Sequence, residues 1–130
     1  MLHEIFKGMD NASEAIDENF KKLGYEVIEN EKGRCVKYAD GTMKCERIVS
    51  LNQTTSLATG NLYRTPTPVS YDFPIPFVKE PYVSASSIIP MIAWPVVGSE
   101  LSQWGALRFY SSVNNQTIEK VILIAEGHWK

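Results

Sequence analysis

Residues 34 to 46 carry the dipeptide Asp40-Gly41 between two short runs in which apolar and polar residues alternate. Asp-Gly accepts the positive backbone dihedral angles of a tight β-hairpin turn, and the alternation is typical of half-buried strands. If these two residues form the loop, one face of the hairpin carries Val36, Tyr38, Met43 and Cys45. The opposite face then carries Lys37, Lys44 and Glu46. The segment therefore predicts an antiparallel strand pair with one face toward a core.

A three-residue loop, with Gly41 as a left-handed bulge, is the alternative for the same segment. It shifts the register by one residue, places Cys35 opposite Cys45 and brings Lys37 onto the apolar face. A shift of one residue turns every side chain to the other side, so only one register can form. We prefer the two-residue loop because it separates the charges from the apolar residues. The two cysteines then point to opposite faces and stay free thiols.

The length and charge of the chain limit what it can do. A chain of 130 residues fits one domain, and a hydrophobic fraction of 44% favours a folded globular protein. The net charge of −2 gives no electrostatic reason to expect binding to nucleic acid or to an anionic membrane. No apolar run approaches the roughly 18–20 residues that span a bilayer, and residues 1–6 are too few for a secretory signal. Free thiols agree with synthesis in a reducing cytoplasm.

Residues 2–23 give the clearest helical pattern in the chain. Apolar residues recur there at spacings of three and four, with one polar position in the seam. The seam consists of Leu2, Ile5, Met9, Ala12, Ile16, Asn19 and Leu23. An amphipathic helix packed on its own domain is one interpretation. The other is a short coiled-coil arm that joins copies of the chain, with Asn19 fixing the register. We divide the chain into an N-terminal helical arm, 1–24, and a β-sandwich domain, 25–130.

Beyond residue 24 the hydrophobic pattern changes to the period of a strand. We expect strands at 25–30, at 34–51 with the hairpin turn and a bulge near Arg47, at 81–89, at 104–113 and at 118–125, the last a central strand. The run 69–77 alternates strictly, and its two prolines predict an edge strand. The fold class we predict is mainly β: an antiparallel β-sandwich of about seven strands with one N-terminal α-helix.

Two stretches between the expected strands do not fit a regular element. Residues 52–68 are rich in Asn, Thr, Ser, Gly and Pro and predict a long loop with at most a short strand at 61–63. Residues 90–98 are too apolar for an ordinary loop and too interrupted by Pro and Gly for a regular strand. Within them, Trp94 would be costly to expose without a partner surface.

Few residues carry the chemistry of catalysis or metal binding. The chain has two histidines, His3 and His128, and its two cysteines are ten positions apart, so neither a three- or four-ligand metal site nor a Cys-x-x-Cys pair is indicated. No nucleophile, zinc or phosphate-loop motif occurs. A pair of carboxylates acting as in glycosidases needs only a separation in space, but Asp40 and Asp72 already have structural explanations. We predict no enzyme activity, no metal and no cofactor.

Aromatic side chains are the better candidates for a binding site, because flat apolar rings suit the faces of sugars. Core packing is the more common role of a Trp, and Trp94 is the exception for the reason given above. The residues that we predict for contact with a glycan or a protein partner are Trp94, Trp104, Arg108, Tyr110, His128 and Trp129. The residues that we predict for an oligomer interface are Leu2, Ile5, Met9, Ile16, Asn19 and Leu23.

Three stretches, in this order along the chain, resemble bacteriophage tail-fibre and host-attachment proteins. Residues 11–23 contain an Ala-Ile-x-x-Asn-Phe-x-x-Leu core, which in that family lies near the junction with the rest of the tail. Residues 38–43 read Tyr-Ala-Asp-Gly-Thr-Met, and residues 124–129 read Ile-Ala-Glu-Gly-His-Trp. Residues 69–84 are also similar to the middle of fibre tips and of H-type lectin domains. Glu126 and His128 depart from the apolar and Arg residues usual there, which implies a different ligand or none.

The resemblance implies a non-enzymatic phage tail or baseplate component that contacts another virion protein or the host surface through its β-sandwich. A carbohydrate-binding, lectin-like tip is the alternative, and a cell-wall hydrolase is a remote one. The resemblance also implies other phage tail proteins as partners, possible binding to host cell-wall glycan, and a homo-oligomer, with a trimer favoured. Neither nucleic acid nor membrane insertion is expected. The protein would belong to the virion tail and be made in the host bacterial cytoplasm.

Overall fold

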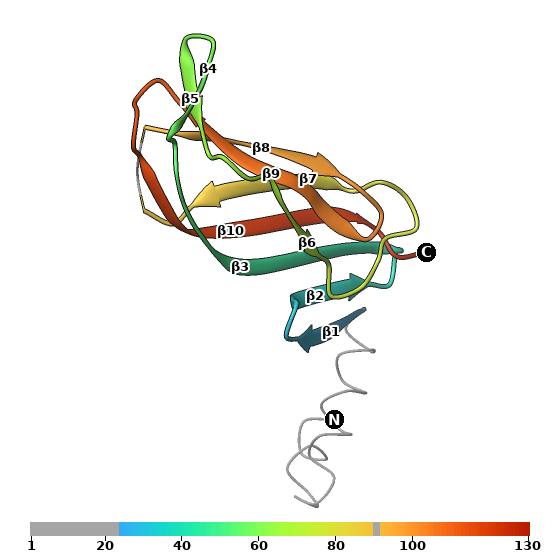
Figure 1. Ribbon diagram of the computed structural model, residues 1–130. Coiled ribbons are helices and arrows are strands. Elements are labelled where there is room, and N and C mark those ends of the chain that lie inside the picture. Colours follow the sequence, from blue (N-terminus) through green and yellow to red (C-terminus); the bar gives the residue numbers. More distant parts are fainter. Residues whose placement is uncertain (1–23, 90–91) are drawn as a thin grey trace, which may run out of the picture.

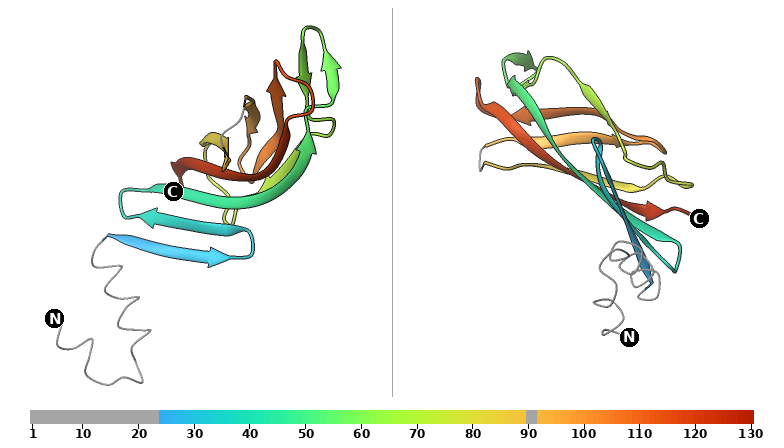
Figure 2. Two further views of the ribbon diagram at one scale, coloured as in Figure 1. Left: turned by 90° about the vertical axis from the view of Figure 1, so that its left-hand side faces the viewer. Right: turned by 90° about the horizontal axis from the view of Figure 1, so that it is seen from below.

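The computed structural model describes residues 24–89 and 92–130, which form two antiparallel β-sheets that face each other (Figure 1). In chain order, the strands are β1 Tyr25–Asn30, β2 Gly33–Tyr38, β3 Thr42–Thr54, β4 Leu57–Thr59, β5 Leu62–Arg64, β6 Val69–Asp72, β7 Tyr82–Ser87, β8 Trp94–Ser99, β9 Gln103–Ser111 and β10 Thr117–His128. Sheet A has the order β1-β2-β3-β10-β7. Sheet B has the order β4-β5-β9-β6. Both β5 and β6 pair with one edge of β9, and β8 pairs with the opposite edge of β9. At one end of sheet A, β1 and β2 extend past the area that sheet B covers (Figure 2).

The predicted fold class is wrong, because the part of the chain that the structure describes is all β. The described residues form ten strands instead of about seven, and they contain no helix. The helix expected over 2–23 lies outside the described residues, so the division of the chain at residue 24 stays a prediction. The strand count differs because 52–68 contains the two short strands β4 and β5, and because 90–98 contains β8. The two antiparallel layers themselves are observed.

The core lies between the two sheets and follows from strand alternation. In β9, Trp104, Leu107 and Phe109 point inward and are at most 1% exposed, while Arg108 and Tyr110 point outward. The strand predicted at 118–125 is central, as expected, because β10 lies between β3 and β7. The buried hydrophobic residues are Cys35, Met43, Cys45, Val49, Leu51, Phe73, Phe77, Ala85, Trp104, Leu107, Phe109, Ile118, Val121, Leu123 and Ala125.

The hairpin turns where the sequence predicts, but the preferred register is wrong. Cys35 pairs with Cys45 and Lys37 pairs with Met43, which leaves a three-residue loop between β2 and β3. Gly41 has a φ of 95°, the left-handed conformation of the bulged alternative. The two cysteines therefore share the buried face and form a disulfide, so the predicted free thiols are absent.

Lys37 can lie on the inner face of the hairpin because its ammonium group makes a cation–π contact with an aromatic ring. Its Nζ is 5.0 Å from the ring centroid of Trp129, and the Nζ of Lys130 lies 5.1 Å from the same ring. A cation over an indole face is attracted by the ring quadrupole, while its stem packs against apolar surface. The indole Nε1–H also donates to the carbonyl of Tyr38 at 2.8 Å. These contacts of Trp129 thus stabilise the three-residue-loop register, which the local pattern of charges disfavours.

The loop itself is fixed by one carboxylate. The hydroxyl and the backbone N–H of Thr42 both donate to Asp40, at 2.7 and 2.9 Å. These two hydrogen bonds, the hydroxyl's first, lower the pKa of Asp40. The interpretation of Asp40 as a turn residue is therefore confirmed, and its carboxylate is occupied by the turn.

No bulge lies near Arg47, contrary to the prediction. The pairing of β3 with β10 runs unbroken from Thr42 to Ser50, so Arg47 keeps the alternation and turns inward at the margin of the core. Its guanidinium donates to the carbonyl of Asp72 at 2.9 Å and lies 5.4 Å from the ring centroid of Tyr71. Arg47 is accommodated because the stem of an arginine packs on apolar surface while its head finds acceptors.

Two proline-rich stretches differ from the prediction: 69–77 forms a shorter strand than expected, and 90–98 contains a strand that was not expected. Only Val69–Asp72 of the alternating run forms a strand, and this strand, β6, is at an edge as predicted. The stretch judged too irregular for a strand contains β8, Trp94–Ser99. Pro95 is tolerated there because β8 pairs with β9 alone and does not need donors on both sides.

Candidate contact surfaces

Three of the residues predicted for contact lie together on the outer face of sheet B. Trp94 pairs directly with Tyr110 across β8 and β9, and Arg108 pairs with Val96 two residues further along. On the other side of β9, Tyr110 also pairs with Arg64 of β5. Directly paired residues of antiparallel strands project to the same face. We call this surface the basic-aromatic face and define it by Arg64, Trp94, Val96, Arg108 and Tyr110.

The two arginines of the basic-aromatic face have no acidic partner in the part of the chain that the structure describes. The guanidinium of Arg64 donates to the neutral carbonyl of Thr65 at 3.3 Å. The Nε of Arg108 is buried and has no hydrogen-bond partner among the described residues. Trp94 is 44% exposed. The face therefore combines unneutralised positive charge with an exposed aromatic ring.

Trp104 is not at the surface. It is fully buried, its ring packs edge-on against Phe73 with centroids 4.5 Å apart, and its Nε1–H donates to the carbonyl of Ile124 at 3.0 Å. A fully buried ring cannot stack on a surface ligand, so the structure gives Trp104 the role of joining the two sheets.

Trp129 and His128 lie at the end of β10, away from the basic-aromatic face. Trp129 is half-buried and engaged with the hairpin, as described above. His128 pairs with Thr42 and is exposed. The predicted oligomer-interface residues, Leu2, Ile5, Met9, Ile16, Asn19 and Leu23, lie outside the described residues.

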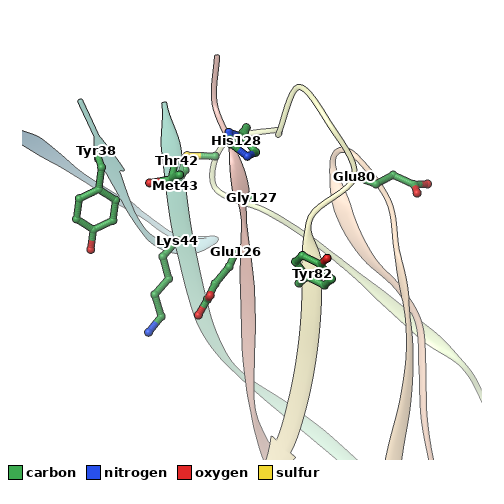
Figure 3. A pocket seen from close by; sticks show the side chains of 9 residues that line it. All are labelled: Tyr38, Thr42, Met43, Lys44, Glu80, Tyr82, Glu126, Gly127 and His128. Carbon is green, nitrogen blue, oxygen red and sulfur yellow. The ribbon is translucent and has the colours of Figure 1, made fainter. Parts of the chain in front are cut away.

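His128 lines a pocket of about 450 Å³ on the outer face of sheet A (Figure 3). The pocket is lined by Tyr38, Thr42, Met43, Lys44, Glu80, Tyr82, Glu126, Gly127 and His128. Glu126 is its central residue, because it pairs with Lys44 of β3 on one side and with Tyr82 of β7 on the other. In Figure 3, these three side chains form a row across the three strands.

The pocket offers an aromatic ring beside groups that form hydrogen bonds. Tyr82 is 88% exposed, an unusual position for so large a ring. The carboxylates of Glu80 and Glu126 and the ammonium of Lys44 supply acceptors and donors for hydroxyl groups. No group of three or more His, Cys, Asp or Glu residues that could hold a metal occurs among the described residues. Nor does any helix in residues 24–89 and 92–130 have the length and apolarity to cross a membrane.

Sequence reasoning found His128 but missed Tyr82, Lys44 and the other residues of the pocket. One signal did point there: Glu126 and His128 are the two positions at which the chain departs from the tail-fibre pattern, and both line the pocket. The row of Lys44, Glu126 and Tyr82 depends on how three distant strands pair, which no local pattern contains.

Exposed apolar side chains also gather along the segment that joins β7 to β8 and on β8 itself. They are Ile88, Ile89, Ile92, Trp94 and Val96. Soluble proteins rarely expose several large apolar side chains close together without a partner, so these residues are a candidate contact surface.

Comparison with known proteins identifies solved structures with a similar fold. No protein-family model and no curated protein matches the chain. Among solved structures, the chain is similar to a C-terminal fragment of the R1 pyocin fibre of P. aeruginosa, with a TM-score of 0.52, 12% identity and 80% of the chain covered. The chain spans 28% of the length of that fragment. It is also similar to an N-truncated R1-type pyocin tail fibre, with a TM-score of 0.50 and 14% identity, over 88% of this chain and 95% of that one. The chain therefore has a tail-fibre-like fold.

Proposed function

We propose that the protein is a non-enzymatic component of a phage tail or a tail-like particle, and that it acts by contact with another tail protein or with the host surface. The observation that carries this proposal is the similarity to a pyocin tail fibre over 95% of that chain. The order of the tail-fibre-like stretches along the sequence supports it independently. On this proposal the protein is part of the virion tail and is made in the host bacterial cytoplasm.

The exposed surfaces of the β-sandwich suit a protein that acts by contact. The apolar segment around Ile92 and Trp94 would be covered by a neighbouring protein in an assembled tail, which removes the cost of exposing it to water. Aromatic residues and arginines are also the side chains most enriched at the energetic centres of protein interfaces. Association with further copies of the chain, as a trimer, stays a prediction.

Particle composition tests this role. Tails or tail-like particles purified from the source bacterium by density gradient are expected to contain the chain in fixed proportion to the other tail proteins. Quantitative mass spectrometry of gradient fractions measures that proportion. A soluble cytoplasmic protein of similar abundance serves as the control for carry-over. If the chain is absent from particles that are otherwise complete, the proposal fails.

A second candidate function is recognition of carbohydrate in the pocket of sheet A. An exposed aromatic flanked by hydrogen-bonding side chains in a depression is the arrangement expected of a lectin-like site, and Tyr82 with Glu80, Glu126 and Lys44 fits it. This role is compatible with the first, because a tail fibre that contacts a cell meets glycans at its surface.

Substitution of the exposed ring tests the pocket. Tyr82→Ala is expected to weaken binding to a cell-wall glycan preparation by about tenfold, because the stacking surface is lost. Ile48→Ala is the matched control, because Ile48 is equally a solvent-exposed residue of the outer face of sheet A but does not line this pocket. Titration calorimetry with both variants gives the affinities. Equal affinities for the two variants would remove the pocket from consideration.

A further inference from the structure

The arginines of the basic-aromatic face are close together because of the strand register. Arg64 is directly opposite Tyr110, and Arg108 lies two residues from Tyr110 on the same face of β9. Arg64 and Arg108 are therefore diagonal neighbours, about 7–8 Å apart or somewhat less at their Cβ atoms. Val96 and Trp94, on the other side of β9, are the direct partners of Arg108 and Tyr110. Two cations thus lie beside two aromatic rings on one continuous surface.

Two ion pairs are formed in the described ranges, and neither includes Arg64 or Arg108. Lys32 pairs with Asp72 at 3.5 Å, and Arg34 of sheet A pairs with Glu46 at 3.5 Å. Arg64 has only a neutral acceptor, and the buried Nε of Arg108 has none within residues 24–89 and 92–130. Buried donors in proteins are almost always hydrogen-bonded. An incoming anion that meets the two guanidinium groups at the surface would neutralise both cations.

The shape of the face limits which ligand can bring that anion. β9 is paired with β8 along one edge and with β5 and β6 along the other, so a peptide cannot add to it as a further strand. Recognition over β9 must therefore come from its side chains. Guanidinium groups bind carboxylate and phosphate through paired N–H donors, and the exposed Trp94 ring offers a flat apolar surface. A sugar ring that carries an acidic group matches both features at once.

We propose that the basic-aromatic face binds an anionic saccharide, whose carboxylate or phosphate lies between Arg64 and Arg108 and whose ring stacks on Trp94. This inference rests on the proposed contact role of the protein, but it names a surface on the opposite sheet from the pocket of Tyr82. It also names the chemical class of the ligand, which the pocket does not.

Titration of the full 130-residue chain with matched sugars tests the inference. The probes are a galacturonic acid oligomer, its neutral methyl ester, a phosphorylated mannan oligomer and the same mannan without phosphate. We expect at least tenfold tighter binding to one or both acidic probes than to the neutral partner of each, with affinity falling as salt rises. The two acidic arms distinguish a carboxylate ligand from a phosphate ligand. Equal binding of the acidic and neutral probes, or no binding of any, overturns the inference.

Variants locate the site. Arg64→Gln combined with Arg108→Gln is expected to lower affinity for the acidic probe at least tenfold, and Trp94→Ala is expected to lower affinity for every probe that binds. Arg34→Gln is the matched control, because it removes one arginine from an exposed strand face of sheet A, and it should leave binding unchanged. Thermal unfolding of each variant verifies that it folds. Loss of binding in the control as well, or retention in the double variant, overturns the inference.

Two further readouts separate this inference from its alternatives. If the double Arg variant lowers the mass measured by light scattering but keeps its affinity for the acidic sugar, the face is a protein interface and the saccharide inference is wrong. Tyr82→Ala should leave acidic-sugar binding intact, and loss there would move the site to the pocket. Acidic-sugar binding by a chain that is absent from tail particles would refute the proposed function alone, whereas particles that contain a non-binding chain would refute the inference alone.

Discussion

Replacing Trp104 with alanine is expected to lower the free energy of unfolding by about 3–5 kcal/mol, the usual cost of removing a large aromatic from a core. The ring is fully buried between the sheets and packs against Phe73 at 4.5 Å and an interplanar angle of 75°. The substitution also leaves the carbonyl of Ile124 without its indole donor. Since domains are stable by only about 5–15 kcal/mol, the variant would be close to unfolding at room temperature.

Urea denaturation followed by circular dichroism measures this loss. Trp94→Ala is the control, because it removes the same side chain from a position that is 44% exposed, and it should cost less than about 1 kcal/mol. Trp104→Phe should recover part of the packing but not the hydrogen bond. Equal losses at the two tryptophan positions would contradict the assignment of Trp104 to the core.

Removing the disulfide is the second large effect that we expect. The double substitution Cys35→Ala with Cys45→Ala should lower the free energy of unfolding by about 2–3 kcal/mol, because the bridge closes a loop of ten residues in the unfolded chain. Both sulfurs are fully buried, so the loss of their packing adds to the effect. The hairpin would keep its turn, because Asp40 and Gly41 form it without the bridge.

Mass spectrometry and unfolding with and without reductant test the bridge. Under oxidising conditions, the denatured protein should show no thiol that reacts with iodoacetamide. The wild-type chain should become less stable when a reductant is added, and the double variant should not respond to it. Two reactive thiols in the oxidised, denatured protein would show that the cysteines are free, as the two-residue loop predicts.

The hairpin shows where local pattern stops being sufficient. Asp40-Gly41 correctly predicts where the chain turns, because the conformation of a turn depends on its own residues. Polarity distinguishes the two registers, and it favours the one that does not form. What the pattern lacks is Trp129, whose ring accepts Lys37 on the buried face and whose indole holds the loop. A lysine counted as a surface residue is thus accommodated, half-buried, on the inner face of the hairpin because it lies over a ring from the far end of the chain.

The contact surfaces were likewise predictable from the sequence only in part. Alternation along β9 predicts that Arg108 and Tyr110 point away from Leu107 and Phe109, and the structure confirms it. The local pattern cannot predict that Trp94 lies opposite Tyr110, because the stretch around it does not read as a strand at all. The pattern singles out Trp94 as the exception to core packing, but it also places Trp104 among the contact residues, and Trp104 is fully buried.

The sequence by itself determined the strand period of most segments, the place of the turn and the antiparallel pairing of strands, because these depend on backbone geometry and on residues close in the chain. Only the tertiary structure decided the register of β2 with β3, the disulfide, and the two surfaces proposed here. Each of these depends on which strands become neighbours, and pairing is set by burial summed over the whole molecule. The side chains that meet at Glu126 or at Arg108 come from segments far apart in the chain, and no local pattern records that they meet.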